Sequence, residues 1–179
     1  MLRRPGDVAR LGLLASAAVV LFVFESLAPR PLPWMKLGLG NLPVLVALLS
    51  FGSGPALAVS AIKLFVGGLL SGGFAGPAFV IGGGAGLVSW VVMVAVRRLC
   101  GGLFGVVGLS IWGALAHQLA QLVLAYAYIG QLGLFALVPL SLFSALLSGG
   151  LIGLLAYWTL DQLRKVGWLA EGPNPLSRN

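Results

Sequence analysis

Long apolar runs, separated by short polar or glycine-rich segments, dominate the sequence. A membrane-spanning helix needs about 20 mostly apolar residues, and several runs approach that length. We expect spans over residues 11–27, 37–51, 55–70, 78–96, 103–128 and 132–158. The second run is short and interrupted by glycine, asparagine and proline, and a turn at 52–55 separates it from the third. The pattern predicts an all-α integral membrane protein, with six transmembrane helices in one compact bundle and a single membrane domain over residues 1–179.

Composition agrees with this fold class. The chain is 59% hydrophobic and 8% charged, with a mean hydropathy of +1.05, whereas soluble domains carry about 25% charged residues. An ordinary soluble protein is therefore excluded. Cys100 is the single cysteine, which excludes an internal disulfide and a cysteine-based metal site. The glycine-rich segment 82–86 lacks a preceding strand and a following Gly-Lys pair, so we expect no nucleotide site. No metal or cofactor is expected.

Basic residues gather at the ends of the apolar runs. With six spans, the side holding both termini would carry Arg3, Arg4, Arg10, Arg97, Arg98, Arg164, Lys165 and Arg178, and the other side Arg30 and Lys36. The positive-inside rule then predicts that both termini, with a tail at 168–179, are cytoplasmic. This clustering also favours contact with anionic membrane lipid over nucleic acid, despite the net charge of +7. We therefore expect a multi-pass protein of the cell membrane.

Two charged residues lie within apolar runs. Glu25 is near the expected outer end of the first span, and Lys63 is in the middle of the third. Charges at membrane depth face protein or water and often mark functional sites. One interpretation is that these two residues neutralise each other, or that Glu25 reaches the interface. The other is that Lys63 anchors an anionic headgroup of a ligand, with Glu25 nearby.

Neutral polar residues form two further clusters. His117 and Gln121 are four residues apart and share a helix face, and Gln118 is adjacent. Such a stripe should point inward, because unsatisfied polar groups in hydrocarbon are costly. Lys36 and Asn41 flank the glycine-containing start of the second span. Both clusters fit a ligand-binding pocket; an interhelical clamp and an interfacial anchor, respectively, are the alternatives.

Small residues at four-residue spacing indicate close helix packing. The pairs are Gly12/Ser16, Gly68/Gly72, Gly82/Gly86 and Gly149/Gly153. Packing within the bundle explains most such pairs. A surface that docks another membrane subunit is the alternative, and Gly12 and Ser16 on the first helix are our candidates for it.

These clusters, in this order, resemble the heptaprenyl diphosphate synthase component I family, also called the Gx transporter family. The family pattern has a Pro-hydrophobe-Lys-hydrophobe-Gly-Leu-Ala-Asn element, a basic residue in the third span, and a Gly-Ala-x-x-His-Asn-x-x-Gln element. The matching positions here are 33–41, Lys63 and 113–121. The sequence departs from the pattern with Gly40 for Ala, Lys63 for Arg and Gln118 for Asn. Lysine keeps the charge but lacks the planar fork of arginine.

The family in turn resembles the substrate-binding S components of energy-coupling factor (ECF) transporters. That resemblance implies a solute captured from the outer side, a separate coupling subunit and ATPases, and docking through small residues of the first helix. The ligand would contact Glu25, Lys36, Asn41, Lys63, His117, Gln118 and Gln121. A carboxylate, a phosphate or a quinone headgroup would each suit a basic, amide-rich pocket.

The older family name implies a different partner, a soluble prenyltransferase. Prenyl diphosphate synthases resemble soluble helical proteins with two Asp-rich motifs, whereas this chain has two aspartates, Asp7 and Asp161, at opposite ends. We therefore expect no catalysis by this chain. The alternative function is a non-catalytic membrane accessory subunit in isoprenoid or quinone metabolism. A redox or scaffold subunit fits less well, because haem-ligand histidine pairs and cysteine clusters are missing from the sequence.

Overall fold

The computed structural model describes residues 5–27, 38–100 and 103–168. In this part of the chain every regular element is helical. The elements are α1 (Pro5–Leu27), the 3-10 helix η1 (Leu39–Asn41), α2 (Leu42–Phe51), α3 (Ser53–Leu70), α4 (Pro77–Leu99), α5 (Val106–Ile129), the 3-10 helix η2 (Leu132–Leu137) and α6 (Val138–Lys165). The expected all-α class is confirmed.

Five of these helices, α1, α3, α4, α5 and α6, are long and apolar enough to cross a membrane. The chain is therefore a multi-pass membrane protein. The expectation of a sixth transmembrane helix at 37–51 is not confirmed, because that run forms a shorter apolar helix. The ten residues of α2 rise about 15 Å, roughly half of the ~30 Å hydrocarbon layer. The glycines and asparagine that precede Pro43 begin this segment with a 3-10 turn in place of regular helix.

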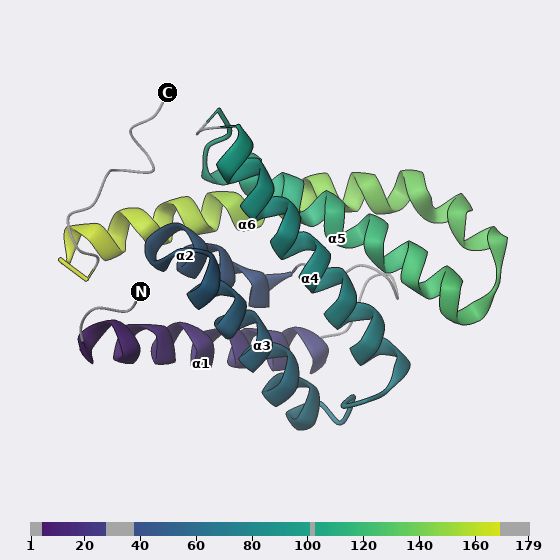
Figure 1. The fold of residues 1–179 in the computed structure, drawn as a ribbon, viewed down its shortest axis with the longest axis horizontal. Helices are drawn as coiled ribbons and strands as arrows, with labels where there is room; N and C mark the ends of the chain where they lie inside the picture. The colour runs from purple at the N-terminus through teal and green to yellow at the C-terminus, as the bar shows by residue number, and fades with distance from the viewer. Residues whose placement is uncertain (1–4, 28–37, 101–102, 169–179) are drawn as a thin grey trace.

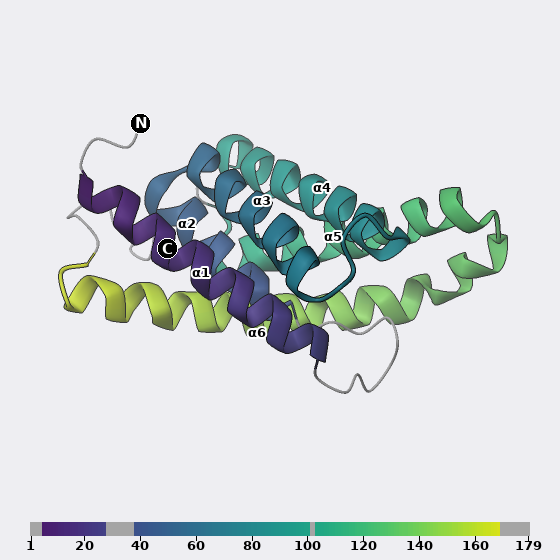
Figure 2. The same ribbon diagram turned by 90° about the horizontal axis from the view of Figure 1, so that it is seen from below.

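The short helix α2 lies in the middle of the bundle (Figures 1 and 2). Residues Pro43–Leu48 are all buried, and side chains from the other five α-helices join them in one hydrophobic core. A helix that is apolar on every side suits such a position. The Arg97 guanidinium of α4 donates a hydrogen bond to the carbonyl of Leu48 near the end of α2, where helix carbonyls lack partners of their own.

The bundle has two halves. The N-terminal half comprises α1, η1, α2 and α3, and the C-terminal half comprises α4, α5 and α6; the most extensive helix contacts lie within each half. Contacts of α2 with α6 and of α3 with α4 join them. Figure 1 shows α5 and α6 as an antiparallel hairpin that extends beyond the loop between α3 and α4. A cavity lies between the two halves, lined by residues from both.

The start of α1 and the end of α6 lie at the same end of the bundle. The Arg10 guanidinium sits 5.7 Å from the ring centre of Trp168, and that ring packs edge-on against Phe51 at 6.3 Å. Trp168, the first residue of the expected tail, is thus part of the packed bundle; residues 169–179 are outside the described part. This shared end agrees with the expectation that both termini face one side of the membrane, which stays a prediction.

Candidate ligand-binding site

A cavity of about 310 Å³ opens between the two halves of the bundle. All five long helices and η1 contribute to its wall. The polar side chains that line it are Glu25, Ser26, Asn41, Ser60, Lys63, Ser71, Ser89, Ser110, His117, Gln118, Gln121 and Ser148. Phe22, Leu45, Leu64, Phe79, Met93 and Ile152 contribute apolar surface. The volume lies at the lower end of the range for small-molecule pockets, and a few polar groups on an apolar wall are typical of such sites.

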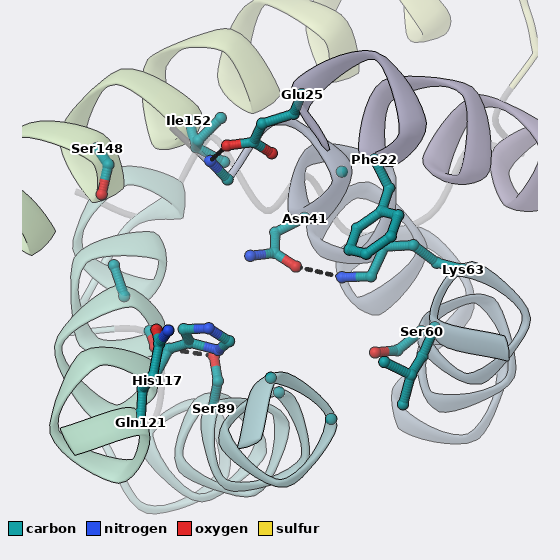
Figure 3. Close-up of a pocket in the computed structure, with 18 of the residues that line it drawn as sticks. Phe22, Glu25, Asn41, Ser60, Lys63, Ser89, His117, Gln121, Ser148 and Ile152 are labelled. Carbon is teal, nitrogen blue, oxygen red and sulfur yellow. Dashed lines mark hydrogen bonds between the residues drawn. The ribbon is translucent and has the colours of Figure 1, made fainter. Parts of the chain in front are cut away.

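Lys63 carries the positive charge of the cavity. It lies on α3, is 9% exposed, and its Nζ donates a hydrogen bond to Oδ1 of Asn41 at 2.5 Å. Asn41 is the last residue of η1, so the 3-10 turn at the start of α2 presents its amide to the lysine (Figure 3). A charged side chain in the interior of a membrane protein is stabilised by a hydrogen-bonding partner of this kind. The amide nitrogen of Asn41 leaves further donors for a bound group.

Glu25 carries the negative charge on the same side of the cavity. Its Oε1 accepts a hydrogen bond from the backbone N–H of Gly38 at 2.5 Å. Gly38 has a φ of 76°, a left-handed conformation that glycine adopts without strain. The hydrogen bond ties the last turn of α1 to the start of η1, beside Asn41. Glu25, Asn41 and Lys63 thus form a connected polar group, which we call the charged wall.

Gly40 makes room for the side chain of Lys63. An added Cβ at this position would lie 3.2 Å from Cδ of Lys63, 3.2 Å from Cβ of Phe22 and 3.3 Å from the carbonyl oxygen of Ala18. These distances are shorter than ordinary van der Waals contact. The aliphatic stem of the lysine therefore packs directly on the η1 backbone, and this contact fixes where its ammonium group lies.

Among the described residues, the opposite side of the cavity is lined by polar side chains that include no Asp, Glu, Lys or Arg. His117, Gln118 and Gln121 of α5 line it, with Ser89 of α4 and Ser148 of α6, and we call this group the neutral wall (Figure 3). The Ser89 hydroxyl donates to the carbonyl oxygen of Gly113 at 2.8 Å. An added Cβ at Gly113 would lie 2.7 Å from Sδ of Met93 and 3.2 Å from the Ser89 hydroxyl oxygen. Glycine at this position thus permits the close contact of α4 with α5.

Six of the seven expected ligand contacts lie around this one cavity. They are Glu25, Asn41, Lys63, His117, Gln118 and Gln121; Lys36 lies outside the described residues. Their convergence from α1, η1, α3 and α5 is what the pocket interpretation requires. The alternative in which Lys63 and Glu25 neutralise each other stays open; the hydrogen bonds that the structure shows run from Lys63 to Asn41 and from Gly38 to Glu25.

The expected docking residues lie elsewhere. Gly12 and Ser16 are exposed on α1, and an added Cβ at Gly12 would meet nothing within 4 Å. They do not line the cavity. Both positions are thus open to lipid or to another subunit, and docking stays a prediction.

The sequence interpretation missed the serines of the cavity. On α5 the lining residues Ser110, Ala114, His117 and Gln121 follow steps of four, three and four. On α4 Gly82, Gly86, Ser89 and Met93 follow the same steps. These spacings place each set on one helix face. Extending the polar stripe of α5 backward by two turns from His117 would have found Ser110; serine is otherwise common in helix contacts within membranes and stands out little.

A comparison with protein-family models decides the relationship of the chain to known proteins. The model for heptaprenyl diphosphate synthase component I matches residues 14–159. The chain belongs to the heptaprenyl diphosphate synthase component I family. The match covers every cavity-lining residue of this component I protein and confirms the resemblance noted from its motifs. No curated protein and no solved structure matches the chain.

Two of the three departures from the family pattern touch each other. Gly40 and Lys63 stand where the resemblance implies alanine and arginine, and an alanine Cβ at position 40 would crowd the lysine stem. In this component I protein the two positions therefore form one packing unit of the charged wall.

The arrangement suits reversible binding. Among the described residues, no three His, Cys, Asp or Glu side chains group together as a metal site would require. Lys63, the amides and the hydroxyls can donate hydrogen bonds to a bound molecule, and Glu25, His117 and the amide oxygens can accept them. The cavity can therefore hold and orient a small polar solute.

Proposed function

We propose that this protein captures a small polar solute inside the membrane and delivers it to a transport system, in the manner of an ECF substrate-binding component. The observation that carries the proposal is the gathering of Glu25, Asn41, Lys63, His117, Gln118 and Gln121 around one cavity of about 310 Å³. Polar side chains from four separate elements are costly in hydrocarbon unless they face one another or a ligand. Because these side chains surround a cavity, a bound ligand explains their positions better than contact among themselves.

Transport by this mechanism needs partners. An ECF-type coupling subunit would contact α1 through the exposed Gly12 and Ser16, and separate ATPases would supply energy. We place the protein in the cell membrane with both termini on the cytoplasmic side, since the basic residues gather there. The solute would enter from the outer side and contact Lys63 and, beyond the described residues, Lys36.

The family name favours a second function, that of a membrane accessory subunit of heptaprenyl diphosphate synthase. In that case a soluble prenyltransferase is the partner and does the chemistry, and this chain is not an enzyme. The cavity supports this function less well as a site for the whole product, because a chain of seven isoprene units would extend beyond a volume of about 310 Å³.

Co-purification separates the two functions. The full chain is extracted from membranes in mild detergent, and bound proteins and small molecules are identified by mass spectrometry. A coupling subunit with ATPases and a small polar compound supports transport. A prenyltransferase and a polyprenyl lipid support the accessory function.

A variant of Lys63 tests whether the co-purified compound binds in the cavity. Lys63→Met keeps most of the side-chain volume and removes the charge. The matched control is Lys165→Met, because Lys165 is an exposed lysine paired with Asp161 at 2.7 Å. The proposal expects loss of the compound from the first variant and retention by the second. Retention by both folded variants would refute it.

A further inference from the structure

We infer that the solute carries an apolar part as well as polar groups, and that this apolar part lies directly on the backbone of α4 at Gly82 and Gly86. These two glycines are then specificity-determining residues, and we call them the bare strip. The inference rests on the proposed function and describes the solute that the same cavity takes. It starts from the glycine-rich segment 82–86 of α4, in which Gly82 and Gly86 line the cavity.

Helix packing does not explain the two glycines of the bare strip. Gly84 of the same segment does pack against α5, since an added Cβ there would lie 2.8 Å from Cδ1 of Leu124. At Gly82 and Gly86 an added Cβ would meet nothing within 4 Å. The close helix packing expected from the Gly82/Gly86 pair is therefore not found, and the space beside these glycines is open.

The bare strip faces the interior of the bundle. Gly82 and Gly86 are one turn of α4 apart, and Ser89, three residues further on, shares their face and is buried. Val80 and Val91 on the opposite face are exposed, so the open space beside the glycines is the cavity and not the lipid. Glycine lowers the stability of a helix relative to alanine, but it allows a ligand to approach the backbone closely. A solute seated on the strip accounts for glycine at both positions.

The surface that α4 presents to the cavity is apolar. Backbone N–H and C=O groups in the middle of a helix bond to one another, and Cα–H groups are weak donors. The Ser89 hydroxyl donates its hydrogen to the carbonyl oxygen of Gly113 at 2.8 Å. Phe79 and Met93 of α4 also line the cavity. The part of the solute that contacts α4 is therefore apolar, and it is flat enough to reach the backbone between larger side chains.

Other parts of the cavity supply contacts for polar groups of the solute. Asn41 and Gln121 line it with amides. Ser110 of α5 also lines it and is 6% exposed, and none of the side-chain hydrogen bonds among the described residues involves its hydroxyl. A buried hydroxyl without a partner is costly, and a polar group of the solute would supply that partner. A solute with one apolar side and one polar side therefore fits the whole cavity.

Leucine variants test the bare strip. Gly82→Leu and Gly86→Leu fill the open space, and Gly150→Leu is the matched control, because a Cβ at Gly150 also meets nothing within 4 Å but lies outside the cavity lining. The full chain is purified in mild detergent, and the compound that it retains is quantified by mass spectrometry. We expect each strip variant to retain at least about tenfold less than the wild-type chain, since overfilled sites exclude their occupant. The control is expected to retain the wild-type amount.

A thiol reagent tests the contact without adding a large side chain, so it decides the question if the leucine variants do not fold. Gly86→Cys and the control Gly105→Cys are made in a Cys100→Ser chain, and Gly105 is exposed beside open space. Each protein reacts with 2-aminoethyl methanethiosulfonate, once with its compound bound and once after the compound is removed. We expect the bound compound to slow modification at position 86 by about tenfold, since an occupied site is closed to the reagent. Modification at position 105 is expected to be unchanged.

The outcomes separate this inference from the proposed function. Equal modification of Gly86→Cys with and without the compound overturns the inference, as does a thiol that stays unreactive after the compound is removed. Full retention by the folded leucine variants of the strip also overturns it, and so does a compound without an apolar part, such as a sugar phosphate. In each of these cases solute capture stands if Lys63→Met loses the compound. A wild-type chain that carries no compound overturns both.

Discussion

The two walls of the cavity differ in how their polar groups are held. In the charged wall, a side chain of α3 meets a 3-10 turn, and Lys63 donates to Asn41 across 22 positions of sequence. In the neutral wall, His117, Gln118 and Gln121 come from successive turns of one helix, α5, which packs tightly between α4 and α6. The first wall is assembled from separate elements, whereas the long polar side chains of the second come from one helix, joined by Ser89 of α4 and Ser148 of α6.

The difference indicates a division of labour between the halves of the bundle. A site is most precise where helices hold it, so the neutral wall suits the recognition of shape. The charged wall depends on the η1 turn and on the contact of Glu25 with Gly38, which any movement of α1 or of that turn would break. Movement within the N-terminal half would therefore change the charged wall and leave the neutral wall intact, whereas relative movement of the two halves would change the distance between the walls.

The largest expected effect on binding comes from the charged wall. Lys63→Met and Gln121→Met place the same side chain on opposite walls. We expect the first to weaken binding of the co-purified compound by about 100-fold and the second by about 10-fold or less, because hydrogen bonds to charged groups contribute about 1.5–3 kcal/mol and neutral ones about 1. Equilibrium dialysis measures both. Equal losses of affinity in the two variants would mean that the charged wall and the neutral wall contribute equally to binding.

The next largest effect is on stability, within the C-terminal half. An added Cβ at Gly153 of α6 would lie 2.7 Å from the backbone Cα of Val107, so Gly153→Ala forces α5 and α6 apart. We expect a loss of about 1–3 kcal/mol, as for other overpacked cores, measured by reversible unfolding in mixed detergent micelles. Gly150→Ala is the control, because a Cβ there meets nothing within 4 Å. Equal unfolding of the two variants would contradict this packing.

Hydropathy predicted most of the fold, since five of the six expected runs are long helices. It could not decide whether the second run spans the membrane, because an apolar segment buried among other helices and one that spans lipid have the same composition. Length was the available signal, and the ten residues of α2 are too few to span. The pairing of the helices into two halves also could not be predicted, because similar apolar surfaces cover all of the helices.

The site was predictable where a residue type is costly in hydrocarbon. Lys63, Glu25 and His117 stood out for that reason, and they line the cavity. Ser60 and Ser110 did not, because serine is tolerated at any helix contact in a membrane. The contact of Gly40 with Lys63 links positions 23 residues apart and needed coordinates to be seen.

A smaller effect on binding is expected from Gly40→Ala. The new methyl group would push against Cδ of Lys63, 3.2 Å away, and shift the ammonium group relative to Asn41. We expect about fivefold weaker binding, close to 1 kcal/mol. Gly54→Ala, at a position with open space, is the control. If Gly40→Ala has the same effect in a Lys63→Ala background, the lysine stem is not the cause.

The smallest expected effect is on the unfolding free energy, and it distinguishes a side-chain hydrogen bond that joins two helices from one that lies within a single helix. Ser89 donates to Gly113 across the contact of α4 with α5, whereas Ser148 donates to Ala145 within α6. Side-chain hydrogen bonds between membrane helices contribute about 0.6 kcal/mol, so Ser89→Ala should lower the unfolding free energy by about that amount. Ser148→Ala should lower it less, because its bond does not join two helices. Because both residues line the cavity, unfolding is measured on protein from which the solute has been removed. A larger loss of unfolding free energy in Ser148→Ala than in Ser89→Ala would mean that α4 and α5 are held together by packing alone.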